Sequence, residues 1–308
     1  MRWKFFVLCL VSVFFFAAAG RAQTPLAEVP YAYTSEGWIT IPVSVNGQPG
    51  YDFIFDTGAT LTVAYDRLAK EQDFQPVGRD PIRVLGLIQS RYLPPYELGE
   101  ISIGAESLKD HVGVVLPDWP APLSTPHGVL GLDFMSRYTV LFDHQRRVIS
   151  FYERGSLRPA KKQWRLIQLN ANAYGEDTKG LLQVTARFRG ERVRCLLDIG
   201  SASTVINNYA YRALTGGVST VQKFGRGAIT GSRLHGVFGE EKIVRYSRIS
   251  NLRMGRARWR NPIVAIYDAD IFEELGVDRQ SHCLIGADLF KDKSFILDFS
   301  ENTLYISK

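Results

Sequence analysis

Histidine and cysteine are scarce in this sequence. The 308 residues include five histidines and three cysteines, and the histidines do not have the spacing of metal ligands. The chain also has no G-x-S-x-G segment and no phosphate-binding loop. These absences argue against a metal centre, a hydrolase with a serine nucleophile elbow and a phosphate-loop protein. We interpret the histidines as surface or packing residues: His111, His127, His144, His235 and His282.

Long hydrophobic runs are absent after residue 22. Before it, Arg2 and Lys4 precede an apolar stretch, and small residues occupy positions 20 and 22. This pattern predicts a signal peptide, residues 1–22, cleaved after Ala22. An uncleaved anchor is the alternative, although the run is shorter than the roughly 20 residues that span a bilayer. We therefore expect an exported bacterial protein, periplasmic or secreted, with no membrane span after cleavage.

A large excess of charge of one sign is also absent. The formal net charge of +6 falls to +3 once Arg2, Lys4 and Arg21 leave with the predicted signal peptide. Such a small charge does not indicate a polyanionic partner. The densest basic stretch, residues 253–260, could be a nucleic-acid patch. We interpret it instead as the solvated face of a hairpin, and expect no nucleic-acid partner.

An internal repeat organises the chain. Residues 37–65 and 180–208 each hold alternating strand-like residues, a turn and a second apolar strand that runs into Asp-x-Gly. Residues 128–152 and 283–307 form a second matching pair, in which a Gly and an Asp have the same separation in both copies. Two copies of one unit indicate a duplication with pseudo-two-fold symmetry.

Strand-like runs dominate both copies. Short stretches rich in β-branched and aromatic residues are bounded by Gly, Pro or Asn, which is an all-β pattern. Short helical stretches are expected near residues 65–72, 133–137, 209–215 and 288–293. The polar, basic segment 153–165 is predicted to link an N-terminal lobe, residues 23–152, to a C-terminal lobe, residues 166–308.

An Asp-x-Gly triplet lies at the same place in each copy. Asp56 and Asp198 both follow an apolar strand and precede a tight turn. One triplet alone is weak, because Asp and Gly are ordinary turn residues. The duplication strengthens it, because a pseudo-two-fold axis can bring the two loops together. Two carboxyl groups so close cannot both ionise and would share one proton.

With these residues the chain resembles an aspartic peptidase of the pepsin and retropepsin superfamily. The resemblance rests on the segment FIFDTGA at 53–59 with VLG at 129–131, and on LLDIGS at 196–201 with LIG at 284–286. These motifs occur in the family's order, and the resemblance covers nearly the whole chain after the predicted signal peptide. It implies an all-β, two-lobed, pseudo-symmetric acid-protease fold with a central cleft.

The resemblance also implies an aspartic endopeptidase that acts on a polypeptide without a metal or organic cofactor, and we expect a monomer. Asp56 and Asp198 would form the catalytic dyad, one taking a proton from water and the other donating to the scissile carbonyl. The supporting residues would be those beside the two aspartates: Thr57, Gly58, Ala59, Ile199, Gly200 and Ser201.

Ile199 departs from the family pattern. The family's usual Thr beside each Asp gives a hydroxyl to a hydrogen-bonded brace between the loops, which Thr57 can supply and Ile199 cannot. The alternative function is therefore a catalytically weakened or inactive peptide-binding protein on the same fold.

The resemblance carries two further expectations. Cys195 and Cys283 lie on strands that are neighbours in the family's arrangement, which implies a disulfide, with two buried free thiols as the alternative. The Gly-containing segments 84–93 and 227–237 are similar to flaps that close over a bound peptide, or are plain surface hairpins.

Two details of the sequence give expectations about the dyad and the N-terminus. The Ser201 hydroxyl could donate to Asp198, whereas Ala59 offers Asp56 nothing, so we expect Asp198 to be the ionised partner. The short segment between residue 22 and Trp38 suits an extended tail and is too brief to be a cleft-filling propeptide, so we expect activity without propeptide removal.

Overall fold

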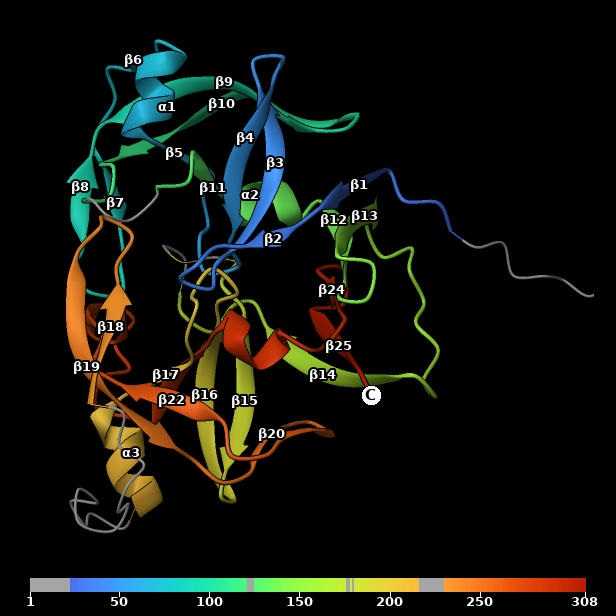
Figure 1. Cartoon of the computed structure of the whole chain (residues 1–308), viewed down its shortest axis with the longest axis vertical. Coiled ribbons are helices and arrows are strands. Elements are labelled where there is room, and N and C mark those ends of the chain that lie inside the picture. Colours follow the sequence, from blue (N-terminus) through green and yellow to red (C-terminus); the bar gives the residue numbers. More distant parts are fainter. Residues whose placement is uncertain (1–22, 121–124, 176–177, 179, 216–229) are drawn as a thin grey trace, which may run out of the picture.

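The computed structural model describes residues 23–120, 125–175, 178, 180–215 and 230–308. The predicted signal peptide lies outside the described residues. Two β-rich lobes lie one above the other in Figure 1, the N-terminal lobe uppermost. Within the described ranges, no helix has the length and apolar character needed to cross a membrane.

An eight-stranded sheet forms the N-terminal lobe. Its strands, in spatial order, are β2 (Ala32–Tyr33), β3 (Ile39–Val45), β4 (Gln48–Phe55), β11 (Gly128–Leu130), β5 (Val63–Tyr65), β10 (Glu106–Leu116), β9 (Pro95–Ile103) and β6 (Gln75–Pro76). A separate hairpin, β7 (Ile82–Val84) with β8 (Arg91–Leu93), extends from it. The helices α1 (Asp66–Glu71) and α2 (Leu132–Met135) lie close to the residues where the sequence predicts helical turns.

The C-terminal lobe repeats this arrangement. Its strands, in spatial order, are β15 (Gln183–Phe188), β16 (Glu191–Leu197), β23 (His282–Ile285), β17 (Val205–Ile206), β22 (Ile263–Ile266), β19 (Glu241–Arg248) and β18 (Thr230–His235). A hairpin of β20 (Leu252–Met254) and β21 (Ala257–Trp259) extends the sheet from β15. The described part of this lobe also contains α3 (Asn208–Thr215), α4 (Asp270–Glu274) and the 3₁₀ helix η2 (Ala287–Phe290).

A shared sheet joins the two lobes. In order it contains β1 (Ala27–Pro30), β13 (Val148–Glu153), β12 (Tyr138–Asp143), β24 (Phe295–Asp298), β25 (Thr303–Ser307) and β14 (Trp164–Asn170). The antiparallel pair β12 and β24 places Leu141 directly opposite Ile296, the corresponding residue of the second copy. The pseudo-two-fold axis therefore passes between these two residues, and the Phe142 ring stacks on Phe295 beside it, with 4.7 Å between centroids.

The segment before Trp38 differs from the predicted extended tail. Residues 27–30 form β1 and pair with β13, while residues 32–33 form β2 and pair with β3. The segment is too short for its pattern to be recognised as strand. Tertiary pairing, together with the buried side chains of Ala27 and Val29, orders it.

The all-β, two-lobed fold expected from the sequence is confirmed. Each lobe contains a strand that runs parallel to the strand preceding the Asp-x-Gly turn. Leu130 of β11 pairs with Phe55 of β4, and Ile285 of β23 pairs with Leu197 of β16. Because these pairings correspond through the repeat, they place both aspartates at equivalent positions.

Candidate active site

The two aspartates are anchored through their backbones. The Asp56 amide donates to Leu130 O at 3.1 Å, and the Asp198 amide donates to Ile285 O at 3.0 Å. Each acceptor belongs to the parallel strand of the same lobe. The apolar-apolar-Gly motif therefore holds the start of each Asp-x-Gly loop, which explains why the two motifs occur together.

The loops meet closely enough for the carboxyl groups of Asp56 and Asp198 to hydrogen-bond each other. A side chain at Gly58 would collide with the Asp198 carboxyl, and one at Gly200 would collide with that of Asp56. The glycine of each triplet thus makes room for the carboxyl group of the opposite lobe. The structure brings together all four of these sequence-predicted residues.

Thr57 forms a one-sided brace between the loops. Its Oγ1 donates to Leu197 O at 2.9 Å and accepts from the Ile199 amide at 2.9 Å, and its side chain is fully buried. Ile199 packs into the core and supplies no hydroxyl in return. The brace across the dyad therefore has one of the two hydroxyl groups that full symmetry would give.

Burial raises the pKa of both aspartates. The backbone N–H groups of Gly58, Ala59 and Gly200 oppose this rise at Asp56, with Gly58 N 2.6 Å from Asp56 Oδ1. At Asp198 the neighbouring Asp56 raises the pKa further. Three backbone N–H groups lower the pKa of Asp56 and two lower that of Asp198, a difference that favours Asp56 as the carboxylate of the coupled pair.

The Ser201 hydroxyl does not make the contact with Asp198 that was expected from the sequence. The Ser201 hydroxyl donates to Ser203 O at 3.0 Å, and the contact with Asp198 Oδ1 comes from the Ser201 backbone N–H at 2.9 Å. Ala59 does contribute, since its backbone N–H favours the ionised form of Asp56. The predicted hydroxyl contact was wrong because it considered side-chain donors and overlooked backbone donors, whereas the identity of the ionised partner stays a prediction.

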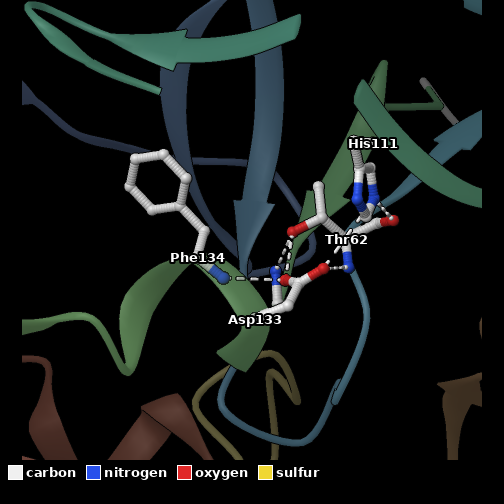
Figure 2. A network of polar contacts seen from close by, with 5 residues as sticks. Thr62, His111, Asp133 and Phe134 are labelled. Atoms are coloured by element: carbon white, nitrogen blue, oxygen red, sulfur yellow. Dashed lines mark hydrogen bonds and ion pairs between the residues drawn. The ribbon is translucent and has the colours of Figure 1, made fainter. Parts of the chain in front are cut away.

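A second pair of aspartates, Asp133 and Asp288, forms hydrogen bonds with the loops that follow Asp56 and Asp198. Thr62 Oγ1 donates to Asp133 Oδ1 at 2.6 Å and accepts from the Gly131 amide, while the Thr62 amide donates to Asp133 Oδ2 at 2.8 Å (Figure 2). His111 Nε2 lies 2.7 Å from Thr62 O on the other side. This network ties the loop after Asp56 to the start of α2.

The C-terminal lobe contains the matching network. Thr204 Oγ1 donates to Asp288 Oδ1 at 2.7 Å and accepts from the Gly286 amide at 3.1 Å. Burial raises the pKa of Asp288 to about 6, against the opposing hydrogen bonds from Thr204. The sequence analysis missed both aspartates, although a Gly-x-Asp in each repeated block was the signal that could have identified them.

Cys195 and Cys283 form a disulfide with their Cα atoms 4.3 Å apart. They pair directly across the parallel strands β16 and β23, and both are fully buried. The bond therefore joins the strand that ends at Asp198 to the strand that anchors the Asp198 backbone.

A cavity of about 730 Å³ contains both Asp56 and Asp198 in its lining. The N-terminal lobe lines it with aromatic and aliphatic side chains that include Trp38, Tyr65 and Trp119. Residues of the hairpin β7–β8, of the hairpin that begins with β18 and of other parts of the C-terminal lobe complete the wall. A cavity of this size is typical of a ligand site.

The two hairpins predicted as flap candidates line this cavity. Residues 84–93 belong to the hairpin β7–β8. Residues 230–237 form β18 and the start of the turn into β19, whereas residues 227–229 lie outside the described residues. Both hairpins reach the opposite lobe. The hairpin β7–β8 does so through two contacts: Arg83 pairs with Glu274 at 2.5 Å, and the Asp270 amide donates to Leu87 O at 3.2 Å.

The C-terminal hairpin is held in a different way. Val237 O accepts hydrogen bonds from Tyr65 Oη and Trp119 Nε1, both at 3.3 Å. Phe238 is buried among the side chains of the N-terminal lobe, and the Arg91 guanidinium lies 4.7 Å from its ring centroid. The contacts of this hairpin centre on the buried side chain of Phe238, whereas β7–β8 is held by a partly exposed ion pair, one backbone bond, the Arg91 contact and apolar side chains that are only partly buried.

Among the residues that the structure describes, no three His, Cys, Asp or Glu side chains lie close enough together to hold a metal ion. The two carboxyl groups can exchange protons with a molecule bound between them.

Comparison with known proteins agrees with this geometry. A family model described as aspartyl protease matches residues 41–134 and 184–289. Each matched region contains one Asp-x-Gly loop and one apolar-apolar-Gly strand. No curated protein matches the chain. With both copies of the repeat matched in this order, the chain belongs to the aspartyl protease family.

Proposed function

We propose that the protein is an aspartic endopeptidase that hydrolyses peptide bonds with the Asp56/Asp198 dyad. The observation that supports this best is the contact between two partly buried carboxyl groups in the wall of a cavity of about 730 Å³. A family match to aspartyl proteases supports a protease role in general.

The mechanism follows from the unequal environments of the two carboxyl groups. Asp56, as the carboxylate, takes a proton from a water bound between the pair, and the water oxygen attacks the scissile carbonyl carbon. Asp198 donates its proton to the carbonyl oxygen. The proton on Asp56 then passes to the leaving nitrogen as the C–N bond breaks, and Asp198 regains its proton when the carbonyl reforms.

Hydrolysis of a diverse peptide library from acid to neutral pH tests this proposal. The segment 23–308 would be compared with Asp56→Asn and Asp198→Asn, after circular dichroism shows that all three are folded. We expect cleavage by the unsubstituted protein alone. Equal cleavage by all three would overturn the proposal.

A second candidate function rests on Ile199, which leaves the brace one-sided. This candidate is a peptide-binding protein on the same fold with weak or no turnover. Isothermal titration with library peptides distinguishes the two, because saturable binding without cleavage at any pH would favour the second.

We also infer that the protein is exported after cleavage behind Ala22, on the basis of the charged, apolar and small-residue pattern of residues 1–22. Mass spectrometry of the protein from a bacterial periplasm or culture fluid should give Gln23 as the first residue. An intact N-terminus on protein confined to the cytoplasm would contradict this inference.

A further inference from the structure

Basic residues are concentrated in two sequence segments of the C-terminal lobe. Residues 180–197 and 242–267 together hold eleven lysines and arginines and one acidic residue, Glu191. The whole chain carries only +6, so the remainder of the sequence is net acidic. The small net charge therefore conceals a strong separation of charge along the chain.

Four of these arginines stand in line across neighbouring strands. The strands lie in the order β16, β15, β20 and β21. Three of them, β16, β15 and β20, are labelled in the lower half of Figure 1. In the antiparallel register, each arginine lies directly opposite the next. We call this set the arginine row: Arg192, Arg187, Arg253 and Arg258.

The arginine row faces solvent. All four side chains are exposed, whereas the residues beside them along each strand, such as Val193, Ala186 and Leu252, are buried. Cross-strand partners project from the same face of a sheet, so the four guanidinium groups share one surface. With neighbouring strands about 4.8 Å apart, the row extends over roughly 14 Å.

The protein itself does not neutralise this row. Within the described part of the chain, none of the four arginines has an ion-pair partner. Arg187 donates one hydrogen bond, to Gly190 O at 3.1 Å. Like charges directly opposite each other in a sheet are destabilising. An external anion would relieve the repulsion, and guanidinium groups bind phosphate in a bidentate manner.

The surroundings of the row favour a broad anionic surface over a nucleic acid. Proteins that bind single strands stack the bases on exposed aromatic side chains. The one aromatic residue on β20 and β21, Trp259, is half-buried, and its Nε1 donates to Leu289 O at 2.6 Å. Arg194 and Arg256, also exposed, add charge at the margins of the row.

We propose that this face of the C-terminal lobe docks on the surface of an anionic phospholipid membrane through the arginine row. Clusters of four to eight basic side chains are of the size that binds acidic lipid headgroups. The docking is peripheral and electrostatic, and it is independent of the proposed peptidase activity.

Vesicle co-sedimentation tests the proposal. The protein should bind vesicles that contain phosphatidylglycerol, should not bind vesicles of phosphatidylcholine alone, and should be released by high salt. The double variant Arg187→Glu/Arg253→Glu should lower the partition coefficient by about tenfold or more. Arg79→Glu/Lys109→Glu makes the same change in net charge at exposed sites of the N-terminal lobe and should bind nearly as well as the unsubstituted protein.

A conservative variant separates loss of binding from loss of folding. Arg187→Lys/Arg253→Lys keeps the charge and should retain most of the binding. Equal binding to neutral and anionic vesicles, or equal loss in the row and control variants, would overturn the proposal. Binding of single-stranded DNA or soluble polyphosphate without binding of anionic vesicles would also overturn it.

Discussion

Thr57 shows how much one buried hydroxyl does at this site. It satisfies Leu197 O and the Ile199 amide at once, and both groups belong to the opposite lobe. Ile199 has no hydroxyl that could form an equivalent bond from the other lobe. The loss of the Thr57 hydroxyl would therefore leave two buried backbone groups without partners.

Thr57→Val should therefore destabilise the protein by about 2 kcal/mol or more and lower kcat/KM, because unsatisfied buried groups each cost about 1–3 kcal/mol. Thr57→Ser, which keeps the hydroxyl, should restore most of both. Urea denaturation with peptide hydrolysis measures the two effects. A Val variant as stable as the unsubstituted protein would show that the brace contributes nothing.

The direction of the Ser201 hydroxyl gives a prediction about pH. Because this hydroxyl donates to Ser203 O, Ser201→Ala should leave the acidic limb of the kcat/KM profile in place. The backbone N–H that contacts Asp198 remains in the variant. A pH–rate profile of the two proteins checks this, and a clear shift of the acidic limb toward higher pH would restore the original role for Ser201.

Asp288 should make stability depend on pH. Burial raises its pKa from 3.8 to about 6, so the folded protein holds a proton that the unfolded chain loses earlier. The stabilisation is full below pH 3.8 and is lost as the pH rises through 6, by about 3 kcal/mol in total.

Asp288→Asn removes this titration and can still accept from Thr204. Between pH 4 and 7 the variant should lose up to about 3 kcal/mol less stability than the unsubstituted protein. Chemical denaturation at several pH values measures this difference. Asp292→Asn, an exposed change on the adjacent segment, controls for the loss of one charge. Parallel pH curves for Asp288→Asn and the unsubstituted protein would contradict the prediction.

At the scale of elements, the two hairpins over the cavity differ in how firmly they are held. The tip of the C-terminal hairpin has partly buried hydrogen bonds to Tyr65 and Trp119 and the buried side chain of Phe238. The hairpin β7–β8 is held by the ion pair of Arg83 with Glu274, one backbone bond, the contact of Arg91 with Phe238 and apolar side chains that are only partly buried. We expect β7–β8 to be the hairpin that opens.

Arg83→Gln should speed amide hydrogen exchange in β7–β8 by up to about fivefold, with a change in global stability below about 1 kcal/mol, the range of a partly exposed ion pair. The charge-swapped double variant Arg83→Glu/Glu274→Arg should slow exchange again. Arg79→Gln, at an exposed site before the hairpin, serves as the control. Exchange unchanged by Arg83→Gln would assign no holding role to the pair.

Local patterns predicted the elements that depend on short stretches of sequence. The alternating runs that end at Asp56 and Asp198 are read as strands because burial on one face repeats every second residue. The hydrogen bond from Tyr65 to Val237 O joins residues that are far apart in sequence. Such a contact leaves no periodic signal in the sequence, so it could not be predicted. The same reason applies to the pairing of Arg83 with Glu274, and to the strand at 27–30.

At the scale of the whole molecule, the repeat explains why the aspartate pair could be predicted from the sequence and why the residues that support it could not. Duplicated motifs identified the pair at Asp56 and Asp198, because symmetry turns two weak signals into one strong one. The same duplication contained Asp133 and Asp288, yet their role became clear only from their hydrogen bonds to Thr62 and Thr204. The uneven distribution of charge along the chain was likewise hidden by a small net charge.

The register of β12 on β24 has a consequence for assembly. Since Leu141 faces its own counterpart Ile296, the edge of β12 is shaped to meet a strand of nearly the same kind. A lobe without its partner would present this edge, with Val140 and Phe142, to other copies of itself. We expect the isolated segment 23–160 to self-associate into two-fold dimers or larger aggregates, as measured by light scattering. A stable monomer would show that the first lobe has no need of the second. Retaining both lobes in one chain thus protects the molecule from pairing with its own copies.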